Sequence, residues 1–72
     1  MQIHVLKTDL KSLQEVKTIA PILDLHPQII SWNVDTQDID NVLRIEGLLP
    51  LDEEEIIPLL RQYGVYSETL NY

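Results

Sequence analysis

The sequence predicts an α+β fold in which a four-stranded antiparallel sheet carries two helices on one of its faces. Two observations support this prediction. Two segments have apolar residues at helical spacing, each after a residue that caps helices, and short β-rich segments lie before, between and after them. The order along the chain is β-α-β-β-α-β. With 72 residues, 44% of them hydrophobic, the chain fits one small domain over 1–72.

The first strand is expected over residues 2–7, where Ile3 and Val5 alternate with polar residues and should face the helices. Ser12 then predicts the start of a helix, and Glu15 three residues later completes a capping box. Helical spacing defines the buried stripe of this helix, which consists of Leu13, Val16, Ile19, Ala20 and Leu23.

Proline shapes the rest of the first helix. Pro21 has no backbone N–H and its ring clashes with the preceding turn, so we expect a kink or a break within residues 17–21. The helix should end near Leu25 or His26, because Pro27 restrains the residue before it to extended backbone.

The middle of the chain predicts a hairpin. Residues 29–35 form a strand with Trp32 and Val34 on one face, and residues 42–46 form a strand with Leu43 and Ile45 on one face. The connecting residues, 36–41, are rich in turn formers. A loop around Pro50 should follow.

The second helix is predicted to start after Asp52, with Glu55 completing a D-x-x-E box. Its buried stripe is expected to consist of Ile56, Leu59, Leu60 and Tyr63. Pro58 lies near the start of this helix, where proline is better tolerated, and Gly64 is suited to the position after its end. Residues 65–70 should form the last strand. This order of elements is the split βαβ, ferredoxin-like pattern.

Composition excludes several classes of function. The net charge is −7, from 12 acidic and five basic residues, which speaks against nucleic acid and anionic membrane surfaces as partners. Cysteine is absent, which removes disulfides, thiolate metal sites and cysteine catalysis. No apolar run is long enough to span a membrane and no signal peptide is visible, so a cytoplasmic location is expected.

Three stretches of the sequence resemble the heavy-metal-associated (HMA) domain, a small copper-chaperone-like ferredoxin fold. "LDLHPQIISWNVD" looks like that family's helix end and second strand, and "VLRIEG" looks like its third strand. "LDEEEIIPLLRQYGVYSETL" is similar to its last helix and strand. The resemblance covers nearly the whole chain and implies the same fold.

The resemblance also implies a metal site, which this chain departs from. The family binds soft ions through M-x-C-x-x-C between the first strand and the first helix, and the matching stretch here is "TDLKSLQE" without cysteine. We therefore expect no metal ion and no cofactor. The alternative is a Cu or Zn site with non-thiolate ligands, for which the candidates are His4, Asp9 and His26.

The acidic clusters have structural explanations. A calcium loop starting at Asp35 would place Glu46 at its twelfth position, but Asp40 would then stand where such loops need glycine. The acidic run 52–55 suits the start of a helix, where the dipole favours negative charge. No nucleophile, phosphate loop or tuned carboxylate pair is recognisable, which predicts that the chain is not an enzyme.

The sheet face away from the helices is the predicted interaction surface. If Ile3 and Val5 face the helices, the opposite face of the sheet presents a mixed polar and aliphatic strip. The interface candidates on it are His4, Leu6, Ser31, Asn33, Val42 and Arg44. The last strand could also pair edge to edge with another chain.

These observations predict a small, non-catalytic interaction or oligomerisation module that has lost cysteine-based metal binding. Its expected partner is another protein or a second copy of the chain. Two alternatives remain open: the non-thiolate metal carrier or sensor, and a small-molecule-binding regulatory domain of the ACT type. The ACT type shares the order of elements, but it needs a ligand cleft at a dimer interface.

Overall fold

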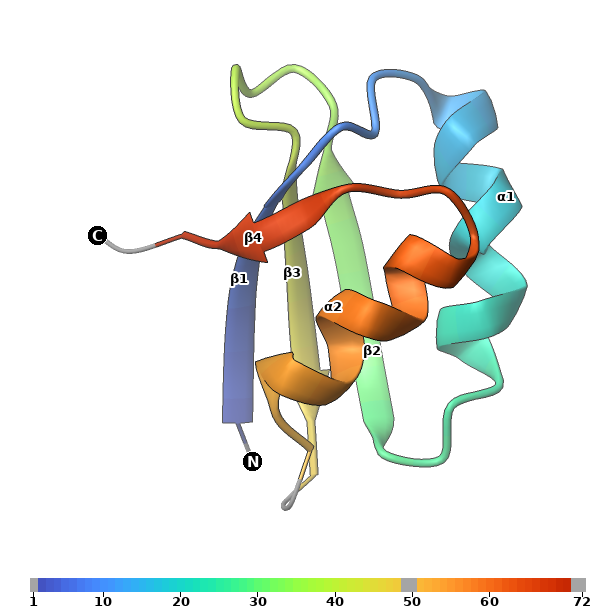
Figure 1. The fold of residues 1–72 in the computed structure, drawn as a ribbon, viewed down its shortest axis with the longest axis vertical. Helices are drawn as coiled ribbons and strands as arrows, with labels where there is room; N and C mark the ends of the chain where they lie inside the picture. The colour runs from blue at the N-terminus through green and yellow to red at the C-terminus, as the bar shows by residue number, and fades with distance from the viewer. Residues whose placement is uncertain (1, 49–50, 71–72) are drawn as a thin grey trace.

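Residues 2–48 and 51–70 of the computed structural model follow the predicted order of elements (Figure 1). The predicted loop around Pro50 lies partly outside these described residues. The elements are β1 (Gln2–Thr8), α1 (Leu13–Asp24), β2 (Ile29–Asp35), β3 (Val42–Gly47), α2 (Glu53–Gln62) and β4 (Ser67–Thr69).

The four strands form one antiparallel sheet in the order β2-β3-β1-β4, so the first strand lies inside the sheet. Both helices pack on the same face, as predicted, and the core fills the space between them and the sheet. The core is aliphatic throughout and consists of Leu6, Leu10, Ile19, Leu23, Leu43, Ile45, Leu51, Ile56, Leu60 and Val65.

Both helices begin at the predicted caps. The Ser12 hydroxyl accepts a hydrogen bond from the Glu15 amide at 3.3 Å, and Asp52 Oδ1 accepts one from the Glu55 amide at 3.1 Å. In a complete capping box, the glutamate side chain also accepts a hydrogen bond from the amide of the cap residue, and neither of the described helices has this second bond. The Glu15 carboxylate accepts from the Lys11 amide, and the Glu55 carboxylate turns toward His26. The caps therefore supply only one half of each capping box.

The predicted break at Pro21 is wrong, because α1 runs unbroken from Leu13 to Asp24. Proline has no amide hydrogen, so the Lys17 carbonyl loses its usual partner four residues on. Lys17 is exposed, which leaves that carbonyl on the solvent side of the helix. Ile19 and Leu23, on either side of the proline, are fully buried, and their packing holds the helix in place.

Gly64 ends α2 as predicted. Its φ of +81° lies in the left-handed region that favours glycine. The Val65 amide donates to the Leu60 carbonyl and the Gly64 amide donates to the Arg61 carbonyl, both at 3.0 Å. This is the Schellman arrangement, and the buried Val65 and Leu60 supply its apolar contact.

The predicted orientation of β1 is wrong. His4, Leu6 and Thr8 face the helices and are buried, whereas Ile3 is 58% exposed on the opposite face. His4 lies opposite Ile45 and Leu6 opposite Leu43, both core residues of β3. Two of the residues that point toward the helices, His4 and Thr8, are polar. Both are hydrogen bonded, which offsets the cost of burying a polar group.

Three smaller expectations also differ from the structure. Leu13 and Tyr63 belong to the predicted buried stripes but are 69% and 53% exposed. Both lie at helix ends, away from the buried pairs Ile19 and Leu23 of α1 and Ile56 and Leu60 of α2. The last strand is shorter than the predicted 65–70, with only three residues paired to β1. The orientations of Trp32, Val34, Leu43 and Ile45 are confirmed.

Candidate functional site

The loop between β1 and α1 corresponds to the metal-binding loop of the HMA resemblance, and its side chains bind backbone groups. Thr8, which is buried, donates from Oγ1 to the Asn41 carbonyl at 2.6 Å and accepts from the Leu10 amide at 3.2 Å. Asp9 accepts from the Tyr66 amide at 3.1 Å, and the Asp9 amide donates to the Tyr66 carbonyl. These bonds fix the loop against the turn before β3 and the segment before β4.

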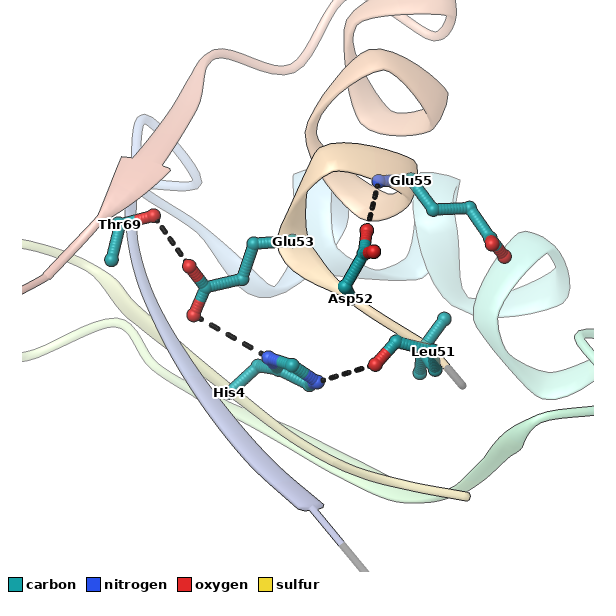
Figure 2. A network of polar contacts seen from close by, with 6 residues as sticks. All are labelled: His4, Leu51, Asp52, Glu53, Glu55 and Thr69. Carbon is teal, nitrogen blue, oxygen red and sulfur yellow. Dashed lines mark hydrogen bonds and ion pairs between the residues drawn. The ribbon is translucent and has the colours of Figure 1, made fainter. Parts of the chain in front are cut away.

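His4 connects β1 to the start of α2 (Figure 2). Its Nε2 lies 3.2 Å from the Leu51 carbonyl oxygen and its Nδ1 lies 3.4 Å from Glu53 Oε1. The other Glu53 oxygen accepts a hydrogen bond of 2.7 Å from the Thr69 hydroxyl. The network therefore joins β1, α2 and the end of β4 around one buried imidazole.

Both neighbours of the His4 ring are hydrogen-bond acceptors. A neutral imidazole carries one N–H and can satisfy only one of them, whereas the imidazolium form donates to both. The side chain of His4 is only 10% exposed, so water has little access to the acceptor that a neutral ring leaves without a donor. In either neutral tautomer, therefore, only one of the two contacts, to the Leu51 carbonyl or to Glu53, is a hydrogen bond donated by the ring.

His26 makes a second contact with the first turn of α2. Its Nε2 lies 3.1 Å from Glu55 Oε2, and its Nδ1 accepts from the Gln28 amide at 3.1 Å. Because Nδ1 is an acceptor, the neutral form with the proton on Nε2 satisfies both neighbours. The two histidines thus hold the start of α2 from opposite sides with different hydrogen-bonding patterns.

The three candidate metal ligands are not brought together. His4 contacts Glu53, His26 contacts Glu55 and Asp9 contacts the Tyr66 backbone. Over residues 2–48 and 51–70, no group of three or more His, Asp or Glu side chains could hold a metal ion.

The hairpin acids act as turn formers. Asp35 Oδ1 accepts from the amides of Gln37 and Asp38, at 3.0 and 3.2 Å. Asp38 Oδ1 accepts from the Asp40 amide at 2.8 Å. These local bonds agree with the interpretation of residues 35–40 as a turn.

The predicted interface candidates divide between two faces. Ser31, Asn33 and Arg44 are exposed on the open face of the sheet, where Asn33 lies opposite Arg44 and Arg44 lies opposite Val5. Val42 is 9% exposed and presents little surface. His4 and Leu6 are buried on the helix face, so their predicted position on the open face is wrong. Ile3 and Val5 take their place there.

Sequence reasoning missed a groove between the two helices. A cavity of about 400 Å³ is lined by Pro21, Ile22, Leu25, His26, Leu59 and Tyr63. A second cavity, of about 180 Å³, is lined by Asp9, Leu10, Glu15, Thr18, Tyr63, Gly64 and Val65. Tyr63 lines both, so the two cavities adjoin at this residue, and we call the pair the interhelical groove. The sequence shows Leu25 and Tyr63 only as large apolar residues near the ends of the two predicted helices. The helical pattern predicted that Tyr63 is buried, so it gave no indication of a groove.

One tyrosine has an altered acidity. The Tyr66 hydroxyl donates a 2.7 Å hydrogen bond to the Glu68 carboxylate. This bond and the negative charge of Glu68 raise the pKa of Tyr66 above its ordinary value, because both disfavour the phenolate. The side chain of Tyr66 lies at the surface, while its backbone amide and carbonyl are hydrogen bonded to Asp9.

Neither helix in the described part of the chain has the length and apolar character needed to cross a membrane.

Comparison with known proteins identifies the fold. No protein-family model matches the chain, and no curated protein matches it. A solved structure described as "Crosstalk between Cu(I) and Zn(II) homeostasis" superposes with a TM-score of 0.82 at 11% identity, covering 97% of this chain and 100% of that one. A structure described as "CsoZ metallochaperone" gives a TM-score of 0.76 at 12% identity, over 93% and 96%. The chain therefore shares the ferredoxin-like fold of these proteins, which agrees with the fold that the HMA resemblance implies, and its sequence contains no cysteine.

Proposed function

We propose that this chain is a non-catalytic protein-interaction module on a metallochaperone-like scaffold that does not use thiolate metal binding. The scaffold is supported by the fold that the chain shares with one structure described under Cu(I) and Zn(II) homeostasis and with one described as a metallochaperone. The absence of cysteine from the sequence supports the loss of thiolate ligands.

The observation that carries this proposal is the use of the β1–α1 loop. Thr8, Asp9, Ser12 and Glu15 all accept hydrogen bonds from backbone amides. A metal loop presents its ligands to an incoming ion, whereas these side chains hold the loop closed upon itself and upon Tyr66. The loop therefore supports a structural role for the residues that replace the thiolates.

The cavities beside the helices support the non-catalytic part of the proposal. Thr18 lines one end of the interhelical groove and His26 lines the other. Neither cavity pairs a serine or threonine hydroxyl with an imidazole, which is a common arrangement in nucleophilic catalysis. The His26 ring is also held by Glu55 and Gln28.

The proposal is tested by following the amide NMR spectrum of the full chain during titration with Cu(I) and then Zn(II). We expect no shifts that saturate at one equivalent, because the described His, Asp and Glu side chains form no group of three. The variant His4→Asn serves as a control for loose binding to an imidazole.

Saturating shifts at His4 and residues 8–12 would contradict the proposal and support the metal carrier with non-thiolate ligands. Sedimentation analysis then examines the interaction role. A strict monomer that binds no protein from its own source would also count against the proposal. Dimerisation with a ligand-dependent cleft would favour the ACT-type alternative.

A further inference from the structure

The interhelical groove has an apolar middle. Ile22 and Leu25 come from α1 and its C-terminal end, and Leu59 and Tyr63 come from α2 and its end. Leu25 is 83% exposed and Tyr63 is 53% exposed. Two large apolar side chains thus lie beside a depression of about 400 Å³ and lose water contact only if something covers them.

The ends of the groove are acidic. Asp9 and Glu15 line one end, and Glu55 contacts His26 at the other. No lysine or arginine is among the residues lining either cavity. Among the described residues, Asp9 and Glu15 form no ion pair with a basic side chain, since their hydrogen bonds go to backbone amides. The end at Asp9 and Glu15 therefore carries negative charge without an ion-pair partner among the described residues, whereas Glu55 at the other end is paired with His26.

From this arrangement we propose that the interhelical groove binds a basic amphipathic helix of a partner protein. Apolar side chains of that helix would cover Ile22, Leu25 and Leu59, and its Lys or Arg residues would meet Asp9 and Glu15. This inference rests on the proposed interaction function and identifies its surface and the chemistry of its partner.

Two features favour this occupant over other partners. The charge of the chain is −7, so a second copy brings like charge toward the acidic ends, whereas a basic segment is attracted to them. The groove follows α1, whose 12 residues span about 18 Å at about 1.5 Å per residue. A helix of similar length matches that span and places anchors at i, i+3 or i+4, and i+7.

The test uses a synthetic peptide of about 14 residues, long enough to match α1, with leucine at those positions and arginine on both flanks. Two control peptides accompany it. One has the same composition in an order that abolishes the helical spacing, and the other has glutamate in place of each arginine. Each is titrated into the full-length chain and followed by amide NMR. We expect saturable shifts at Leu10, Thr18, Ile22, Leu25, Leu59 and Tyr63 with the first peptide alone.

Matched variants assign the contact. Leu25→Ser should weaken binding about tenfold, whereas Leu13→Ser, also at an exposed leucine but outside the groove, should leave it unchanged. Glu15→Gln should weaken binding about threefold at low salt, and Glu54→Gln, at an exposed acid outside the groove, should not. Glutamine keeps an acceptor for the Lys11 amide, so α1 retains its start.

Several results would overturn the inference. If the reordered basic peptide binds equally well, charge alone explains the binding and no amphipathic helix is recognised. If the shifts lie on the open face of the sheet, the peptide binds there and not in the groove. Concentration-dependent shifts at the groove without peptide would identify a second copy as the occupant. No binding of any peptide, with a spectrum that also ignores Cu(I) and Zn(II), would reject the groove but not the proposed function. Stoichiometric metal binding would reject the proposed function itself.

Discussion

His4 Nδ1 lies 3.4 Å from Glu53 Oε1, while the opposite ring nitrogen lies 3.2 Å from the Leu51 carbonyl oxygen. One buried side chain of β1 thus contacts both the residue before the cap of α2 and the first residue of that helix. Glu53 continues the chain of contacts to Thr69. The position of α2 on the sheet therefore depends on a polar contact as well as on apolar packing.

Replacing His4 with alanine should lower the free energy of unfolding by about 2 kcal/mol. The substitution removes a buried ring and leaves the Leu51 carbonyl without its donor. Urea unfolding followed by circular dichroism measures the change. Ile3→Ala, at the neighbouring exposed position of the same strand, is the control and should cost about half as much or less. Equal costs would show that the His4 contacts contribute little.

Removing either helix cap should cost about 1 kcal/mol. Ser12→Ala and Asp52→Ala each delete a side-chain acceptor for an amide three residues on. Asp52→Asn keeps an acceptor and should retain most of the stability, so it serves as the control. The midpoints of urea unfolding distinguish the three variants. A loss in Asp52→Asn as large as in Asp52→Ala would assign the effect to charge at the helix start instead.

Replacing either glycine with alanine should lower the free energy of unfolding, but for different physical reasons. A Cβ added at Gly64 has no neighbouring atom within 4 Å, so the cost of Gly64→Ala, about 1 kcal/mol, comes from the positive φ alone. Gly64→Asn should cost less, because asparagine tolerates the left-handed region better than alanine does. A Cβ on Gly47 would overlap Leu51 Cδ2 and lie 3.1 Å from the Gln28 carbonyl oxygen. Leu51 is fully buried, so we expect a larger cost, of about 2 kcal/mol.

A double variant separates the two mechanisms. Leu51→Ala should reduce the additional cost of Gly47→Ala, because the overlapping side chain is gone, but should not change the cost of Gly64→Ala. Free energies of unfolding from urea titration provide the comparison. Additive costs for Gly47→Ala and Leu51→Ala would contradict the steric explanation.

The phenol of Tyr66 should ionise at higher pH than an ordinary tyrosine. Its hydrogen bond to Glu68 favours the neutral form, and the carboxylate charge disfavours the phenolate. Because the pKa of Tyr66 is higher in the folded state than in the unfolded state, this contact stabilises the folded state at pH values below 10.0. That stabilisation is lost as the pH rises through the pKa of the folded state. NMR titration of the Tyr66 ring in the folded protein measures this pKa.

Two variants separate the causes of that shift. Glu68→Ala removes the acceptor and the charge, and should return the Tyr66 pKa close to 10.0. Glu68→Gln removes the charge but keeps an acceptor, so it should lower the pKa by less. A pKa that does not change in Glu68→Ala would mean that the hydrogen bond is not populated in solution.

The elements could be predicted from the sequence because their signals are local. Ser12, Asp52 and Gly64 mark helix boundaries through bonds that reach no further than five residues, and the structure uses all three. Which side chains of β1 point toward the helices could not be predicted from such local signals. Ile3 and Val5 on one face and Leu6 on the other give both faces apolar residues, so alternation alone favoured the wrong face.

The contacts of the site depend on residues far apart in the sequence. His4 and Glu53 are 49 positions apart, and His26 and Glu55 are 29 apart. An isolated histidine in a strand carries no signal for such a partner, so its burial could not be anticipated. The interhelical groove likewise depends on how the ends of two helices meet around Tyr63, which no periodicity within one helix describes.

The place of β1 inside the sheet has a consequence for biosynthesis. It pairs with β3 on one side and with β4 on the other, and β4 lies at residues 67–69. A ribosome makes the chain from its N-terminus, so one edge of β1 stays without its partner until nearly all the described residues have emerged. Of the four strands, the one synthesised first is therefore among the last to have both neighbours, and a nascent chain must keep its apolar residues from pairing elsewhere in the meantime.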